Sequence, residues 1–168
     1  MKRFAYATAG LIAVVVAIGS FAVSGSSAKT RSVASATTIS IRHTPLGSTL
    51  VDGQGHTLYL FEGDRPNASK LSQAGLAEWP AFNATRTPVA KGGVISSKIG
   101  TIVTHGQRQV TYDHHPLYYF VGDQMPGETN GQGLNDFGAL WYVLSPAGAA
   151  VKGAPHSSVS SAAPSAGW

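Results

Sequence analysis

The sequence predicts an all-β domain, a small antiparallel β-sandwich or barrel built from two pseudo-symmetric repeats, with at most one short helix. Two observations lead to this prediction. First, a motif occurs twice: residues 58–64 read Leu-Tyr-Leu-Phe-Glu-Gly-Asp and residues 117–123 read Leu-Tyr-Tyr-Phe-Val-Gly-Asp, so five of seven positions agree. Second, short segments of β-forming residues alternate with glycine-rich turns, a pattern typical of sandwiches and small barrels.

The spacing of the motifs defines two copies of one structural unit. The offset of 59 residues also superposes His56 on His115, and self-similarity at a fixed offset indicates a duplicated unit. We place the copies at about residues 46–82 and 105–146, inside one domain that spans residues 38–152.

The expected elements follow from local patterns. Residues 38–43 alternate apolar and polar side chains, which predicts a strand with one buried face. Gly53-Gln54-Gly55 and Gly106-Gln107 each separate two apolar segments, as in hairpins where glycine supplies a positive φ. Residues 69–78 have the composition of a helix that Ser69 would cap. The expected strands are residues 38–43, 48–52, 56–61, 98–105, 108–112, 117–121, 140–144 and 149–151.

Both ends of the chain differ from this domain in composition. A basic start and a long apolar stretch in residues 1–28 predict a secretory signal peptide. The same segment is long enough to span a membrane, so an uncleaved N-terminal anchor is the alternative, and it is the only membrane contact we expect. Residues 29–37 predict a disordered spacer, and residues 153–168 a disordered tail rich in Ala, Ser and Pro. We therefore expect an exported protein, either secreted or in the periplasm or cell envelope.

Composition and charge argue against several classes of function. The chain has no cysteine, so disulfides, thiol chemistry and lipidation of a cysteine are excluded. The net charge is +4, but the Lys and Arg residues are scattered and form no basic run of the kind that indicates nucleic-acid binding. Motifs for a nucleophile, a metal-dependent hydrolase or a nucleotide site are missing. We expect neither a nucleic-acid partner nor an enzyme.

The duplicated Tyr-x-Phe-x-x-Asp pattern, with Trp79-Pro80 after the first copy and Trp141-Tyr142 after the second, resembles a family of secreted repeats. Many members are predicted lipoproteins of bacterial envelopes with a Tyr-x-(Phe/Trp/Tyr)-x-x-Asp motif. The resemblance implies an envelope location and no established activity. Many members also carry a Cys-x-x-x-Cys pair before the Trp-Pro, and this chain has Leu71 and Gly75 at those positions.

The first candidate site consists of the side chains that the two motif copies share: Tyr59, Phe61, Asp64, Tyr118, Phe120 and Asp123. In each copy the two aromatic residues point to one face of a strand. Each aspartate follows a glycine at the strand end, where its carboxylate can accept hydrogen bonds from turn amides. In one interpretation the aromatics form the core, and the two aspartates stabilise their turns and contribute equally to the stability of the fold. In the other, the pairs converge on a cleft and bind a ligand.

The second candidate site is a group of histidines. His114 and His115 adjoin Asp113, and His105 lies across the Gly106-Gln107 turn. Imidazole and carboxylate groups together suit zinc or copper, although adjacent residues on a strand face opposite ways. The alternative is that all three are solvent-exposed turn residues, and on that interpretation no cofactor is expected.

These observations predict an exported, non-enzymatic binding or structural module of the bacterial cell envelope that acts on an unknown envelope ligand or protein. The first alternative is a periplasmic protein that binds a metal or redox cofactor through its histidines and motif tyrosines. A second alternative is a hydrolase in which Asp64 and Asp123 form a pair of carboxylates.

Overall fold

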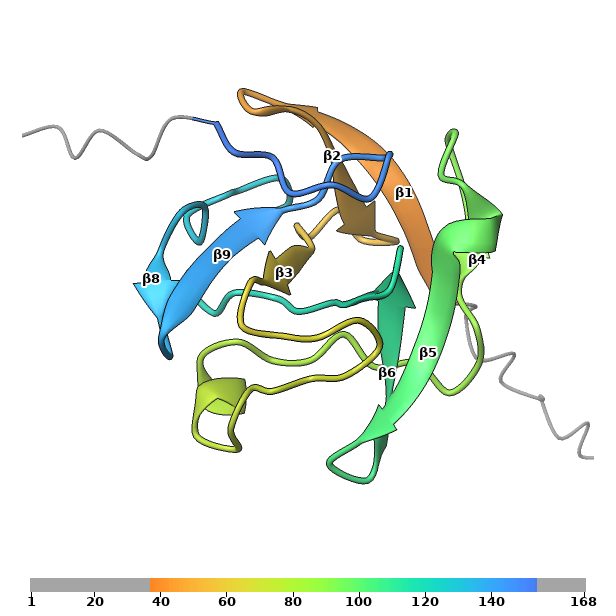
Figure 1. The fold of residues 1–168 in the computed structure, drawn as a ribbon. Coiled ribbons are helices and arrows are strands. Elements are labelled where there is room, and N and C mark those ends of the chain that lie inside the picture. The colour runs from red at the N-terminus through yellow and green to blue at the C-terminus, as the bar shows by residue number, and fades with distance from the viewer. Residues whose placement is uncertain (1–36, 154–168) are drawn as a thin grey trace, which may run out of the picture. The chain divides into compact units, whose positions relative to one another are not determined.

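The computed structural model describes residues 37–153, and this part of the chain contains nine strands and two single-turn 3₁₀ helices (Figure 1). The expected signal segment, most of the spacer and most of the tail lie outside the described residues. The elements are β1 (Thr38–Thr44), β2 (Gly47–Asp52), β3 (Tyr59–Phe61), η1 (Gly75–Ala77), β4 (Val89–Ala90), η2 (Ser96–Lys98), β5 (Ile99–Thr104), β6 (Gln107–Tyr112), β7 (His115–Pro116), β8 (Asn135–Asp136) and β9 (Ala139–Val143).

The all-β prediction is confirmed. The strands form three small sheets with the orders β2-β1-β4, β3-β9-β8 and β5-β6-β7. All pairs in these sheets are antiparallel except β1 with β4, which run parallel over two residue pairs. Within residues 37–153, no helix is long and apolar enough to cross a membrane.

Each repeat begins with a hairpin. β1 pairs with β2, and β5 pairs with β6, each through six residue pairs. The chain reverses at Gly47 in the first hairpin and at Gly106 in the second, with φ of 97° and 72°. Glycine adopts these positive values without the steric cost that a Cβ would add. The two hairpins therefore deliver the two motif segments to the interior from equivalent positions.

Residues 69–78 do not form the expected helix and contain only the short turn η1. Ser69 caps nothing, because its hydroxyl is hydrogen-bonded to the Tyr118 hydroxyl at 2.8 Å, and the Lys70 amide is bonded to Asp64. These long-range bonds use the polar groups that would have started a helix, so tertiary contacts override local propensity.

Leu71 and Gly75 lie in contact. Leu71 is buried, and a Cβ placed on Gly75 would stand 2.5 Å from Leu71 Cδ1. These are the two positions at which many members of the resembled family carry cysteines. Here an apolar side chain packed over a glycine occupies that place.

Tyr59 and Tyr118 mark the centre of the repeat symmetry. The Tyr59 amide donates to the Tyr118 carbonyl at 2.9 Å, and the Tyr118 amide donates to the Tyr59 carbonyl at 3.0 Å. The two motif segments therefore cross antiparallel. On their outer sides Tyr59 pairs with Val143 of β9, and Tyr118 bridges Ala81. Each motif segment is thus central, although the second is extended without forming the regular strand expected over residues 117–121.

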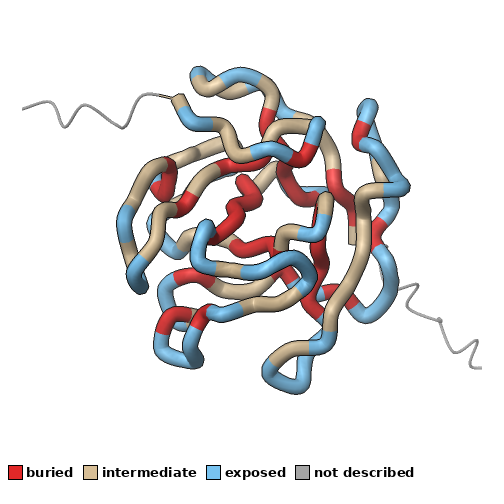
Figure 2. Tube along the Cα trace, in the orientation of Figure 1, coloured by how far each residue is buried: buried red, intermediate tan, exposed pale blue. Residues whose placement is uncertain are grey.

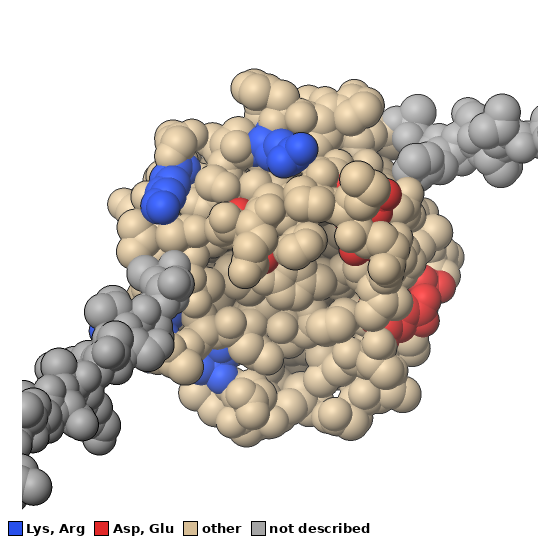
Figure 3. Space-filling model, turned by 180° about the vertical axis from the view of Figure 1, so that it is seen from behind, with Lys and Arg blue, Asp and Glu red and all other residues tan. Residues whose placement is uncertain are grey.

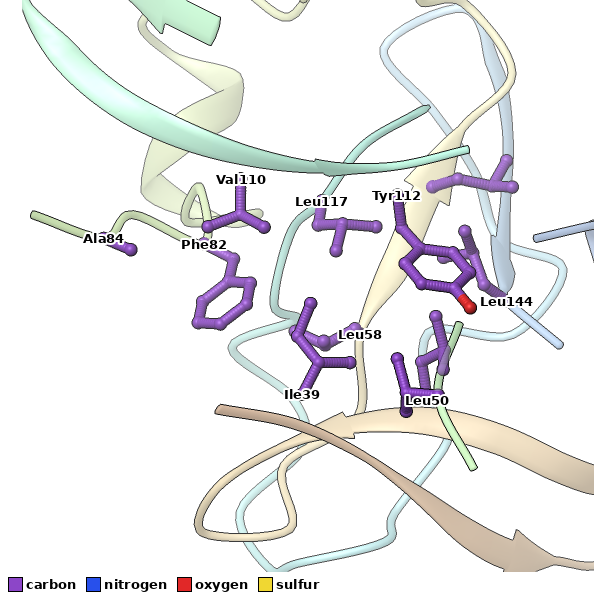
Figure 4. Close-up of a cluster of buried hydrophobic side chains, with 11 residues drawn as sticks. Ile39, Leu50, Leu58, Phe82, Ala84, Val110, Tyr112, Leu117 and Leu144 are labelled. Carbon is purple, nitrogen blue, oxygen red and sulfur yellow. The ribbon is translucent and has the colours of Figure 1, made fainter. Parts of the chain in front are cut away.

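Buried residues concentrate where the hairpins and motif segments meet (Figure 2). One hydrophobic cluster contains Leu58 and Leu117, the residues just before the two motif tyrosines, together with Leu50, Val110 and Phe82 (Figure 4). Full burial of each such side chain contributes about 1.5–3 kcal/mol. The second cluster is aromatic and contains the motif rings and both interior tryptophans.

The motif glycines are required by the motif phenylalanines. A Cβ on Gly63 would lie 2.5 Å from Phe61 Cε1, and a Cβ on Gly122 would lie still closer to the Phe120 ring. In both copies the ring of the third motif residue folds back over the glycine two residues later. The spacing Phe-x-Gly is therefore a packing requirement.

We expect Gly63→Ala and Gly122→Ala each to lower the free energy of unfolding by about 1–3 kcal/mol, because the added methyl overpacks against a ring. Urea denaturation measures the loss. The double variant Gly122→Ala/Phe120→Leu should lose less than the sum of its single variants, since the smaller side chain removes the clash. Strict additivity would contradict this explanation.

Candidate functional site

The motif tyrosines and aspartates are paired between the two copies. The Tyr59 hydroxyl donates a hydrogen bond to Asp123 Oδ2 at 2.6 Å, and the Tyr118 hydroxyl donates one to Asp64 Oδ2 at 2.7 Å. Both tyrosines are completely buried, so a hydroxyl without a partner there would be costly. Each copy therefore supplies the tyrosine that the other copy's aspartate needs.

The second oxygen of each aspartate holds the loop that follows it. Asp64 Oδ1 accepts a hydrogen bond from the Lys70 amide at 2.6 Å, and Asp123 Oδ1 accepts one from the Asn130 amide at 2.8 Å. This is the geometry that the turn-stabilising interpretation requires, extended over a longer loop. Both oxygens of each motif carboxyl are occupied by the fold itself.

Four rings form a continuous stack through the centre. Trp79 and Trp141 are parallel, with centroids 3.8 Å apart and an interplanar angle of 6°. Phe120 lies outside Trp79 at 4.4 Å, and Phe61 lies outside Trp141 at 4.5 Å. The stack therefore alternates between copies, and the motif tyrosines meet the tryptophans of their own copies edge-on at 5.4 and 5.2 Å. Such contacts each add about 0.5–1.5 kcal/mol beyond burial.

Asp64 and Asp123 lie at opposite ends of the crossing. The motif segments run antiparallel through Tyr59 and Tyr118, and each aspartate follows the end of its own segment. This topology separates the two carboxyls, and each is bonded to a different tyrosine. The arrangement therefore gives no support to the paired-carboxylate hydrolase.

Burial changes the acidity of the motif groups. Desolvation raises the pKa of Asp64 to about 6, against the opposing effects of the Lys70 amide, the Tyr118 hydroxyl and the Lys70 charge. Desolvation also raises the pKa of Asp123 above its ordinary value, and it raises the pKa values of both tyrosines. The tyrosines therefore stay protonated and act as permanent donors.

The candidate histidines are divided between the two ends of β6. His105 precedes this strand, in the β5–β6 turn, and His114 and His115 follow it. Six strand residues at about 3.3 Å each correspond to roughly 20 Å, so the three side chains are not brought together. Among residues 37–153 no group of three or more His, Asp, Glu or Cys side chains is arranged to hold a metal ion.

Each of these histidines has a local partner or environment. His105 Nε2 lies 3.3 Å from the Leu71 carbonyl, and His114 Nδ1 lies 2.9 Å from Asn67 Nδ2. His115 is half-buried in β7, and desolvation lowers its pKa. The neighbouring Asp113 forms an ion pair with Lys98 at 2.7 Å.

A cleft of about 380 Å³ lies beside the motif centre, and we call it the aromatic cleft. Its walls come from the β2–β3 turn, the end of the second motif and the segment after Trp79. The lining residues are Asp52, Gln54, His56, Thr57, Pro80, Tyr119, Phe120, Val121 and Asp123. Two motif residues therefore belong to both the motif centre and this cleft: Phe120, which stacks on Trp79, and Asp123, which is bonded to Tyr59.

Asp52 organises the polar side of the aromatic cleft. Its Oδ1 accepts hydrogen bonds from the amides of Gln54 at 2.8 Å and His56 at 2.9 Å. Its Oδ2 accepts one from the Tyr119 hydroxyl at 3.0 Å and lies 3.4 Å from His56 Nδ1. Asp52 is only 4% exposed, so it fixes the His56 and Tyr119 side chains in the wall.

Sequence analysis did not select Asp52, His56 or Tyr119 as site residues. The repeat alignment contains a signal for two of them, because Asp52 aligns with Thr111 and Tyr119 with Leu60. Where a charged or polar residue in one copy aligns with an uncharged or apolar residue in the other, the two copies differ in the role of that position. His56 aligns with His115 and carries no such signal.

A second cavity, of about 400 Å³, adjoins the aromatic cleft and shares Asp52, Gln54 and Tyr119 with it. Its other lining residues include Asn83 and Lys91. On the face shown in Figure 3, basic and acidic side chains are scattered and most of the surface is neither.

The fold and its centre define an all-β protein of two interlocked repeats. The chain belongs to a family of secreted repeats of unknown function, which matches residues 40–83 and 100–145. These two matches cover both hairpins with their motif segments, and this confirms the family resemblance seen in the sequence. Comparison with curated proteins and with solved structures gives no match.

We expect Asp123→Asn to be more destabilising than Asp64→Asn at pH 7, by about 1 kcal/mol out of a loss of about 1–3 kcal/mol for an unsatisfied buried group. An amide at position 123 has one acceptor oxygen for two donors, the Tyr59 hydroxyl and the Asn130 amide, and the other partner of that hydroxyl, the Gly131 amide, is itself a donor. At position 64 the Tyr118 hydroxyl retains Ser69 as a partner. Urea denaturation compares the variants, and equal losses would restore the equivalence expected from sequence.

Stability should depend on pH through Asp64. Its pKa in the folded state, about 6, exceeds the ordinary value of 3.8, so protonation of Asp64 favours the folded state. This stabilising contribution is fully present below about pH 4. This contribution is lost as pH rises through 6, by about 1–2 kcal/mol after allowance for partial exposure. The difference between wild type and Asp64→Asn should therefore shrink from pH 4 to pH 8 in urea titrations. The subtraction removes the contributions of His115 and Asp123, and a constant difference would contradict the assignment.

Proposed function

We propose that this domain is an exported, non-enzymatic binding module of the cell envelope and that the aromatic cleft is its ligand site. The single observation that carries the proposal is the cleft itself, about 380 Å³ in volume, with aromatic walls and a few fixed polar groups. Small-molecule sites are typically concave, largely apolar and lined by a small number of oriented polar side chains. Membership of a secreted-repeat family supports the exported location.

The motif centre is less suited to this role than the cleft. Both oxygens of each motif aspartate have partners within the fold, and both motif tyrosines are buried. A saturated, symmetric centre offers a ligand no open hydrogen-bonding group. The cleft lies where the two copies differ, with Tyr119 in place of Leu60 and Asp52 in place of Thr111.

The walls of the cleft are held in a defined geometry. The Thr57 hydroxyl donates to the Glu128 carbonyl at 2.5 Å, and the Gly127 amide donates to the Gly55 carbonyl at 2.9 Å. These bonds tie the β2–β3 turn to the loop after the second motif. A preformed site loses less conformational entropy on binding than one that must order its loops.

The proposal predicts that envelope-derived fragments bind at this cleft. A panel of sugars, short peptides, amines and carboxylates should include members that shift the backbone amide NMR signals of residues 52–57 and 119–123 in a saturable way. Tyr119→Leu, which makes this position like Leu60 in the other copy, should weaken these shifts. Tyr142→Leu, a tyrosine outside the cleft, is the matched control and should leave them unchanged.

The binding role would be wrong if no fragment shifts these signals, or if shifts cluster on another surface and persist in Tyr119→Leu. Tyr119→Leu removes both the aromatic ring and the hydrogen bond to Asp52, so Tyr119→Phe, which removes only the hydrogen bond, serves as a second variant. It keeps the ring and tests the wall of the cleft with less change in packing.

A further inference from the structure

We infer that the aromatic cleft recognises the ammonium group of a cationic ligand, an inference that rests on the binding role proposed above. The first argument is charge. Asp52 and Asp123 line the cleft together with His56, and its lining residues include no Lys or Arg. A site lined by two acidic residues and by no Lys or Arg favours a positive ligand group over an anion.

The second argument is the aromatic wall beside these carboxyls. Tyr119 and Phe120 both line the cleft, and the bond to Asp52 holds the Tyr119 ring. Phe120 is fixed from the other side by its stacking on Trp79. Aromatic faces attract alkylammonium groups through the ring quadrupole, by about 0.5–2 kcal/mol depending on desolvation.

The third argument comes from the other half of the molecule. Trp141-Tyr142 occupies the place that Trp79-Pro80 occupies in the first copy, and Glu62 aligns with Val121 of the cleft wall. At this equivalent place the protein carries a cation of its own. Lys152 Nζ lies 2.8 Å from Glu62 Oε1 and 5.6 Å from the centre of the Tyr142 ring.

At the positions that align with Val121 and with the segment after Trp79, an exposed ammonium group therefore lies beside both a carboxylate and a ring. In the cleft itself the wall residues are Pro80 and Val121, and the carboxyl and aromatic groups come from Asp52, Asp123 and Tyr119 instead. The same pair of chemical groups is present in both halves. In the aromatic cleft the cation would come from the ligand.

The adjoining cavity sets the direction of the ligand. Lys91 lines that cavity and not the aromatic cleft, so a cationic group is disfavoured there. A ligand long enough to enter both would place its ammonium group beside Tyr119 and Phe120 and a neutral or anionic group towards Lys91.

The experiment uses three probes of nearly the same size and different charge: benzylamine, benzyl alcohol and benzoate. Each is titrated into the ¹⁵N-labelled protein at pH 7 and low salt. Benzylamine should shift the amides of residues 52–57 and 119–123 with about tenfold higher affinity than benzyl alcohol, which corresponds to about 1.4 kcal/mol. Benzoate should bind more weakly than either, and added salt should weaken benzylamine selectively.

Three variants test whether benzylamine binds in the aromatic cleft. Tyr119→Leu should weaken benzylamine several-fold, Tyr119→Phe should retain most of the affinity, and Tyr142→Leu should match the wild type. If benzyl alcohol or a sugar binds the cleft as tightly as benzylamine, the ammonium inference is wrong while the binding role stands. If neither the probes nor the fragment panel shifts the cleft amides, the binding role and the inference both fail. The comparison of probes on wild-type protein remains decisive if a variant does not fold.

Discussion

The exchange of hydrogen bonds between the two copies, from Tyr59 to Asp123 and from Tyr118 to Asp64, is the constraint on which the rest of this structure depends. These bonds join groups 64 and 54 residues apart in sequence and lie in a buried centre. Neither copy satisfies its own motif, because the partner of each buried hydroxyl is on the other copy. The two repeats are therefore one folding unit, and an isolated repeat would expose an aromatic face and leave a tyrosine unpaired.

This constraint explains the order of residues in the motif. The tyrosine sits at the backbone crossing, the phenylalanine two residues later closes one end of the four-ring stack, and the glycine makes room for that ring. The aspartate then turns back to the other copy's tyrosine while its second oxygen holds the following loop. Since every position has a packing or hydrogen-bonding reason, the motif by itself specifies an architecture and carries no information about a reaction.

The all-β class, the duplication and the hairpins could be predicted from the sequence because alternation, glycine turns and the fixed offset are local or periodic signals. The exchange of partners could not, since Tyr59 is equally compatible with Asp64 or Asp123 until the chain crossing is known. Residues 69–78 were predicted as a helix from composition, but Ser69 and Lys70 are bonded to the motif centre instead. Asp52 and Tyr119 differ from Thr111 and Leu60 in the repeat alignment, but their hydrogen bond forms only in three dimensions and so could not be predicted from the sequence.

Duplication also explains how the proposed binding site can lie so close to a structural centre. Both halves contribute to stability through the shared motif residues, so the variable positions of the motif are free to differ, as Leu60 and Tyr119 do. Asp123 and Phe120 nevertheless belong to both the centre and the cleft. A ligand that contacts these two residues in the folded state must stabilise the fold, by an amount that grows with the logarithm of its concentration above the dissociation constant. The aromatic cleft therefore shares Asp123 with the Tyr59–Asp123 bond, whereas neither residue of the Tyr118–Asp64 bond lines it.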